Sequence, residues 1–198
     1  MLLWMIACTG ALPEDKTSDD STPDSAVDSP VDTAPPGPFT LRLPAATSSE
    51  GLDHAAECEY TLSVDYECYN ANPELRWENV PADAAALVLV FDDPDANGFD
   101  HWAVVNLPVD GGGLDAGISG QSASHTLPGE SYELRNGFGF TGYLGSCPPS
   151  EHVYRWRMWA ISEPLPADLT RFGQVEAQAE ALSLGLAETC HIYGPATN

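Results

Sequence analysis

The pattern of apolar and polar positions is most informative between residues 84 and 108. The unbroken apolar run from Ala85 to Phe91 is typical of a strand that is buried on both faces of a sheet. The segment Asp92-Asp93-Pro94-Asp95 ends this strand, because proline cannot donate to a sheet ladder. Asn97-Gly98 then predicts a turn into a second strand, which His101-Trp102 opens and residues 103–107 continue. We therefore expect the Asp-Pro-Asp bend and His101 to meet at one rim of a sheet.

The pattern of apolar and polar positions also predicts strands on both sides of this hairpin. Residues 39–43 and 60–64 alternate as half-buried strands do. Residues 74–81 are expected to form another short strand, which ends at Pro81. Residues 152–162 alternate strictly. In this last strand one face holds Tyr154, Trp156, Met158 and Ala160, and the other holds Arg155, Arg157 and Trp159. The apolar spacing from Val175 to Glu188 predicts one amphipathic helix. Many short strands and one late helix indicate a mainly β protein, an antiparallel β-sandwich with few short helices.

The beginning of the chain differs from the rest in composition. Residues 1–8, MLLWMIAC, form a short apolar run that resembles the lipobox of a bacterial lipoprotein signal, with Cys8 as the lipidation site. Residues 9–38 are mostly Pro, Ser, Thr and Asp, so we expect a disordered acidic tether. The folded domain is then residues 39–198. These features predict a lipid-anchored protein of the cell envelope, with its domain outside the cytoplasm.

Charge narrows the classes of partner. The formal net charge is −23, and residues 41–198 alone hold 23 acidic side chains against six arginines. A domain this acidic repels nucleic acid and anionic membrane surfaces, so we expect contact with a membrane through the lipid anchor only. Lys16, in the tether, is the only lysine. Mechanisms that need a catalytic lysine in the domain are therefore excluded.

Four cysteines remain if Cys8 carries the lipid. They form an even set in a compartment that permits disulfides, and four cysteines allow three pairings. A bond between Cys58 and Cys68 is plausible across a hairpin and would leave Cys147 with Cys190. The sequence does not decide between the pairings.

Two motifs resemble known catalytic or cofactor-binding motifs, but the residues around them do not fit those functions. Asp93-Pro94-Asp95 after an apolar strand copies the nucleophilic Asp-x-Asp of haloacid-dehalogenase-type phosphatases, which need a later lysine. Residues 137–142 match G-x-G-x-x-G, but Gly145, Pro148 and Pro149 follow where a dinucleotide site needs a helix. What remains is a glycine-rich loop whose backbone N–H groups could line a small anion pocket.

A third group of residues predicts a polar pocket. His101 and His152 each open a strand beside a proline- or glycine-rich corner. We expect them to gather with the acidic and phenolic side chains of Asp93, Asp95, Tyr143 and Tyr154. Their spacing is no recognised zinc pattern, so neither a metal nor a cofactor is expected. Protonated imidazoles donate stronger hydrogen bonds to an anion, so affinity should rise as pH falls through the histidine range.

Several segments match one family in order and approximate spacing, from about residue 39 to the C-terminus. They are Asn72-Pro73-x-Leu75-x-Trp77-x-x-Val80-Pro81, Asp93-Pro94-Asp95-Ala96, His101-Trp102-x-Val104-Val105-Asn106, Asn136-x-Phe138-Gly139-x-x-Gly142-Tyr143-x-Gly145-x-Cys147-Pro148-Pro149 and His152-x-Tyr154. Together they resemble the phosphatidylethanolamine-binding protein family, also called the Raf kinase inhibitor-like family, in its bacterial branch. Gly137 and Val153 stand where that family usually has Asp and Arg.

The resemblance implies a β-sandwich with a small pocket at one edge that accepts phosphate-like anions and phospholipid head groups. It implies ligand-binding roles for Asp93, His101, Gly145, Pro148, Pro149, His152 and Tyr154, with Tyr143 close by. We therefore expect an exported, lipid-anchored binding protein with a small anion pocket. The alternative is an inhibitor or regulator of a protease or kinase-like partner, acting through the loops around the pocket. Enzymatic activity is the third hypothesis, behind these two, because the sequence shows no activated nucleophile.

Overall fold

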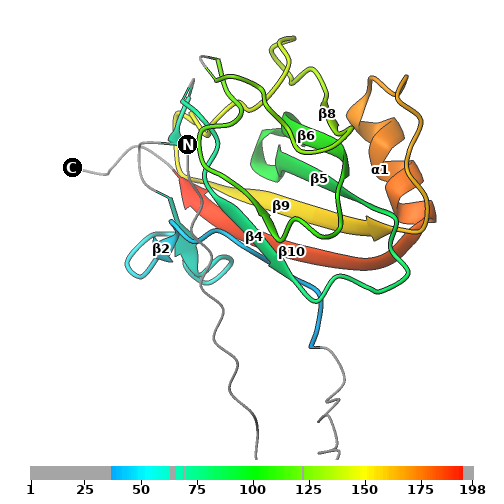
Figure 1. Cartoon of the computed structure of the whole chain (residues 1–198). Helices are drawn as coiled ribbons and strands as arrows, with labels where there is room; N and C mark the ends of the chain where they lie inside the picture. Colours follow the sequence, from blue (N-terminus) through cyan, green and yellow to red (C-terminus); the bar gives the residue numbers. More distant parts are fainter. Residues whose placement is uncertain (1–36, 63–65, 69, 122, 194–198) are drawn as a thin grey trace, which may run out of the picture. The chain divides into compact units, whose positions relative to one another are not determined.

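The computed structural model describes residues 37–62, 66–68, 70–121 and 123–193 (Figure 1). Cys8, the expected signal segment and the tether up to residue 36 lie outside these residues, as do residues 63 and 64 of the strand expected at 60–64. The strands are β1 Thr40–Arg42, β2 Thr47–Ser48, β3 Tyr60–Thr61, β4 Leu75–Glu78, β5 Ala86–Asp93, β6 Phe99–Leu107, β7 Gly113–Leu114, β8 Tyr132–Glu133, β9 His152–Ile161 and β10 Ser183–Tyr193. One α-helix, α1, spans Phe172–Ala181.

The strands form two sheets that share a core. The larger sheet has seven strands in the order β2-β3-β10-β9-β5-β6-β8, and the smaller has the order β1-β4-β7. All pairings are antiparallel except the single contact between β10 and β3. Within the described part of the chain no helix is long and apolar enough to cross a bilayer. The predicted fold class, a mainly β antiparallel sandwich with little helix, is confirmed.

Strand β5 is an interior strand of the large sheet, between β9 and β6, and all eight of its residues are buried. Leu87, Leu89 and Phe91 face the core shared with the small sheet. Val88 and Val90 face a second core, which α1 covers with Phe172, Val175 and Ala179. The prediction that this apolar run is buried on both faces is therefore confirmed.

The neighbours of β5 place the strand ends that matter for the site. Strand β6 pairs with β5 with Phe91 opposite Trp102, as the predicted hairpin requires. Strand β9 pairs with the other side of β5, with Phe91 opposite Trp156. Because both pairings are antiparallel, the end of β5 lies beside the beginnings of β6 and β9. Asp93, His101 and His152 are thereby brought together at one end of these three neighbouring strands.

The C-terminal region differs from the prediction. The helix ends at Ala181, and residues 183–193 form β10 instead of continuing the helix to Glu188. Strand β10 pairs with β9 from Ser183 opposite Ile161 to Tyr193 opposite His152, and the two strands run side by side in Figure 1. Leu186, expected on a buried helical face, is 44% exposed. The long ladder with β9, which pairs ten residues of β10, outweighs the local helical spacing, because it supplies partners for backbone groups along the whole strand.

Two disulfides join distant segments. Cys58 bonds Cys190 and Cys68 bonds Cys147, with sequence separations of 132 and 79 residues. The local hairpin bond between Cys58 and Cys68 is therefore not formed. The first disulfide fastens β10 to the loop before β3, and Cys58 is only 2% exposed.

Removing the Cys58–Cys190 bond with Cys58→Ser and Cys190→Ser should lower the free energy of unfolding by about 2–5 kcal/mol, because a long closed loop of the unfolded chain is freed. Urea denaturation under non-reducing conditions measures the change. A loss below about 1 kcal/mol would show that this bond adds little to the domain's stability.

Candidate functional site

The bend after β5 fixes the carboxylate of Asp93. Pro94–Ala96 form a single 3-10 turn, and Asp93 caps it because its Oδ1 accepts from the backbone N–H groups of Asp95 (3.0 Å) and Ala96 (3.1 Å). Asn97 then adopts a left-handed conformation, with φ of 57°, and ends the turn. The predicted Asp-Pro-Asp corner is thus a capped turn that holds one carboxylate in place.

The second oxygen of Asp93 binds His152. Its Oδ2 lies 2.8 Å from Nδ1 of His152, and the two side chains are 4% and 17% exposed. Asp95 acts differently, since its Oδ2 accepts from the backbone N–H of Val153 at 2.8 Å. Asp93 therefore orients an imidazole, whereas Asp95 fastens the bend to the start of β9.

His101 is held from the other side of the site. Its Nδ1 lies 2.8 Å from the carbonyl oxygen of Leu144, so Nδ1 carries the proton and donates. The residue is 5% exposed and packs between the rings of Phe91 and Tyr154. Burial lowers the pKa of His101 below its usual value, although the Leu144 carbonyl opposes this shift. The neutral ring therefore presents Nε2 as a hydrogen-bond acceptor.

Beneath these groups lies a buried polar chain that the sequence analysis missed. Trp156 Nε1 donates to Nδ1 of His191 at 2.9 Å, so Nε2 of His191 bears the proton and donates to Oγ of Ser146 at 2.8 Å. Burial, helped by the nearby His101, lowers the pKa of His191 to about 3. Burial also raises the pKa of Tyr154, whose ring stacks on His191 at 4.9 Å. Both rings are therefore neutral supports of the site at physiological pH.

These residues enclose a cavity of about 280 Å³. Seven of the nine predicted ligand-binding residues line it: Asp93, His101, Gly145, Pro148, Pro149, His152 and Tyr154. The two exceptions are Asp95, at the bend, and Tyr143, which is 1% exposed in the core and donates from its hydroxyl to the carbonyl of Tyr66 at 2.7 Å. The two histidines from distant parts of the chain thus meet in one cavity.

The remaining lining residues make much of the wall apolar. They are Cys68, Ala96, Phe99, Phe138, Leu144 and Cys147. Phe99 occupies the space beside Gly137, where an added Cβ would come within 2.5 Å of its ring. Among the described residues that line the cavity there is neither lysine nor arginine, and no group of three or more metal-ligating side chains was found. Phe138 comes from the Gly-Phe-Gly-Phe run at 137–140, which is the signal in the sequence for an aromatic wall.

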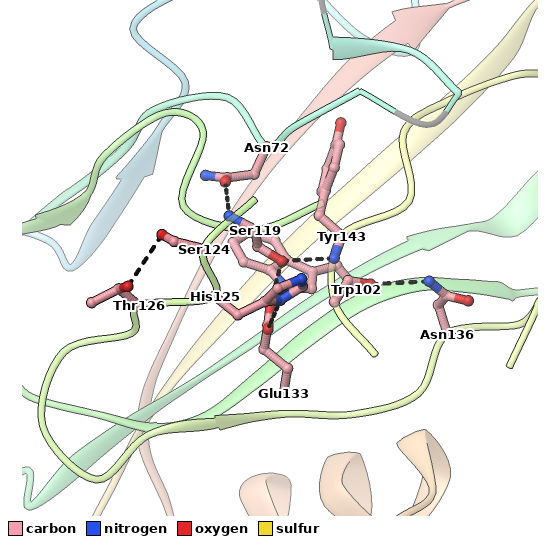
Figure 2. A network of polar contacts seen from close by, with 10 residues as sticks. Asn72, Trp102, Ser119, Ser124, His125, Thr126, Glu133, Asn136 and Tyr143 are labelled. Atoms are coloured by element: carbon pink, nitrogen blue, oxygen red, sulfur yellow. Dashed lines mark hydrogen bonds and ion pairs between the residues drawn. The ribbon is translucent and has the colours of Figure 1, made fainter. Parts of the chain in front are cut away.

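A second buried network holds the loop that carries Leu144 and Gly145 (Figure 2). The Glu133 side chain is 3% exposed and accepts from Trp102 Nε1 (2.6 Å), from the Ser119 hydroxyl and from Nδ1 of His125 (2.7 Å). Ser119 Oγ in turn accepts from the backbone N–H of Tyr143 at 2.8 Å. The network fixes the backbone immediately before the cavity wall. No local pattern in the sequence predicts this network, because its members lie far apart along the chain.

Glu133→Ala should lower the free energy of unfolding by about 1–3 kcal/mol, since it leaves buried donors of Trp102 and Ser119 without their acceptor. Urea denaturation measures this loss. Glu163→Ala, at an exposed carboxylate, is the matched control and should change stability by less than about 0.5 kcal/mol. Equal effects of the two variants would contradict a stabilising role for the network.

Comparison with known sequences links this architecture to one family. The model of the family described as phosphatidylethanolamine-binding protein matches residues 46–193. A UPF0098 protein of Methanothermobacter thermautotrophicus is 36% identical over 148 residues, which cover 71% of this chain and 95% of that protein. The match therefore spans nearly all of a related protein and most of the described domain.

Two further relatives and one solved structure agree with this match. YbcL of Escherichia coli is 33% identical over 63% of this chain and 72% of its own length. A Mycobacterium tuberculosis protein named "Putative lipoprotein LppC" is 35% identical over 62% of this chain and 61% of its own length. The crystal structure of YbcL, titled as a member of the mammalian PEBP family, superposes with a TM-score of 0.68 at 24% identity, covering 80% of this chain and 99% of YbcL. This superposition supports the fold.

Proposed function

The chain belongs to the phosphatidylethanolamine-binding protein family, and from that premise we propose that it is a lipid-anchored binding protein of the cell envelope. Its cavity would bind a small anion, a phosphate or a phospholipid head group. The observation that carries this proposal is the convergence of His101, His152 and Asp93 on one cavity.

The size and the walls of the cavity favour a head group over a whole lipid. Ligand pockets commonly measure about 300–1,000 Å³, and this cavity, at about 280 Å³, lies just below that range. Phe99, Phe138 and Pro148 give it an apolar wall, and Asp93, His101 and His152 give it a polar one. A ligand with a phosphate and a short organic substituent would place each part against a matching wall.

The hydrogen bonds of the two histidines determine how an anion would be held. Nδ1 of each ring is already bonded, to the Leu144 carbonyl and to Asp93. A neutral ring therefore offers the cavity only an acceptor at Nε2, and it can donate there only after it takes up a proton. This refines the expectation from the sequence, in which both rings donate in either state. Anion binding would be coupled to proton uptake.

Three observations support a place in the envelope. Residues 1–8 resemble a lipobox, and one relative is named as a putative lipoprotein. Two disulfides between distant segments suit an oxidising compartment. Together they favour export followed by attachment through Cys8.

The alternative is a regulator of a protease or kinase-like partner. Phe138, at the edge of the cavity, is 63% exposed and could contact a protein surface. Head-group binding is preferred because the cavity also brings together buried polar groups, which a flat protein contact does not need. Catalysis has less support. The only hydroxyl among the described lining residues is that of Tyr154, and burial raises its pKa, which disfavours the ionised, nucleophilic form.

We expect the affinity for an anion to rise as pH falls from 8 to 5, by up to about tenfold per pH unit. Burial lowers the pKa of free His101, so the ring is neutral at pH 7, whereas the complex with an anion favours the protonated ring. The complex then binds more protons than its separated parts, and lower pH stabilises it. Titration with phosphoethanolamine, followed by protein NMR, measures this dependence.

Sulfate is the matched ligand control, because it does not titrate between pH 5 and pH 8. His101→Asn keeps a donor for the Leu144 carbonyl but removes Nε2, and it should flatten the pH dependence. His54→Asn, at a histidine that pairs with Glu57 outside the cavity, should leave it unchanged. Sulfate affinity that is independent of pH in the unaltered chain would refute proton-coupled binding.

Cys8→Ala should move the protein from the membrane fraction to the soluble fraction of a bacterial host and remove the acyl mass from its N-terminal peptide. The reason is that cleavage and acylation both require the cysteine thiol. Thr9→Ala is the neighbouring control and should keep the anchor. Membrane association that survives Cys8→Ala would contradict lipid anchoring at this residue.

A further inference from the structure

The two disulfides lie in different surroundings. Cys58, in the Cys58–Cys190 bond, is 2% exposed, and neither of these cysteines lines the cavity. Cys68 and Cys147 both line it, and Cys147 is exposed to solvent. A reductant in solution can therefore reach the Cys68–Cys147 bond more readily. The position of this bond also makes it part of the cavity wall.

The segment that carries Cys68 is hydrogen-bonded to the loop that bears Cys147. The backbone N–H of Cys68 donates to the carbonyl of Ser146 (2.9 Å), and the N–H of Gly145 donates to the carbonyl of Cys68 (2.7 Å). The approach is so close that a Cβ at Gly145 would lie 2.2 Å from the carbonyl oxygen of Tyr66. The disulfide thus locks a short strip, residues 66–68, onto the loop.

We propose that Cys68–Cys147 is a redox-sensitive disulfide that keeps the cavity in its binding form, and that its reduction by a dithiol opens the wall and releases the ligand. The crosslink joins segments 79 residues apart, so the strip loses its only covalent tie to the loop when the bond breaks. The consequence for the ligand rests on the proposed anion binding. The selectivity of reduction does not.

The chemistry needs only a dithiol as electron donor. One thiolate of the dithiol attacks the exposed Sγ of Cys147, the S–S bond breaks, and Cys68 leaves as a thiolate that takes a proton. The second thiol of the reagent loses its proton and attacks the mixed disulfide, which frees Cys147 as a thiolate that is protonated in turn. Two electrons and two protons pass to the protein, and the dithiol becomes a cyclic or bridged disulfide.

The first experiment measures selectivity on the full chain. The protein is treated with limiting dithiothreitol, quenched with iodoacetamide at intervals, and mapped by mass spectrometry. Cys68 and Cys147 should be alkylated at least about tenfold faster than Cys58 and Cys190, because access controls the rate of exchange. Equal rates, or faster reduction of Cys58–Cys190, would overturn the proposal.

The second experiment measures the cavity in the oxidised and the selectively reduced protein. Affinity for phosphoethanolamine should fall at least about tenfold on reduction of Cys68–Cys147 and return on reoxidation. Cys68→Ser with Cys147→Ser should imitate the reduced form, and Cys58→Ser with Cys190→Ser is the matched control that should bind like the unaltered chain. Selective reduction of the unaltered chain keeps the test decisive if either variant fails to fold.

Amide hydrogen exchange separates this proposal from the proposed function. Reduction should speed exchange at the N–H groups of Cys68 and Gly145 at least about tenfold, whatever the cavity binds. If the oxidised protein does not bind phosphoethanolamine, the anion proposal fails while exchange still tests the opening of the wall. Unchanged exchange after selective reduction would overturn the redox proposal.

Discussion

The carboxylate of Asp93 is the group on which the geometry of the cavity depends. One oxygen accepts two backbone N–H groups of the bend, and the other accepts from His152, which lies 59 residues later in the chain. A buried carboxylate is costly unless such partners replace water, and here three donors do so. The same bonds that stabilise the charge therefore join the end of β5 to the start of β9 and set the direction of the His152 ring.

The position of Asp93 follows from the period of two in a strand. Asp92 and Asp93 are neighbours at the end of β5, so their side chains leave opposite faces of the large sheet. Asp93 faces the cavity, while Asp92 pairs with Arg155 and Arg157. Arg157 also binds Glu176 on α1, so this pair of arginines lies on the helix-covered face. The alternation thus separates a site with permanent cations from one whose only basic groups are imidazoles.

Much of this arrangement could be predicted from local pattern. The apolar run of β5 and the alternation of β9 were sufficient, because burial on one or both faces leaves a direct trace in the sequence. The resemblance to a known family supplied Gly145 and the two prolines. The end of α1 could not be predicted, since β10 depends on a ladder with β9. The supporting side chains of Glu133 and His191 were also missed, because only the folded chain brings them to Ser119 and Ser146.

The charge of the domain limits how the cavity can hold an anion. A surface this acidic opposes the approach of a negative ligand, and the described lining contains no fixed cation to offset that field. Negative charges also repel one another near Asp100, at the start of β6. Burial, together with the carboxylates of Glu176 and Asp92, raises the pKa of Asp100 to about 6. Positive charge in the cavity can therefore come only from protons on imidazoles. Since Oδ2 of Asp93 holds Nδ1 of His152, the same carboxylate that shapes the cavity also sets the orientation of one of these imidazoles.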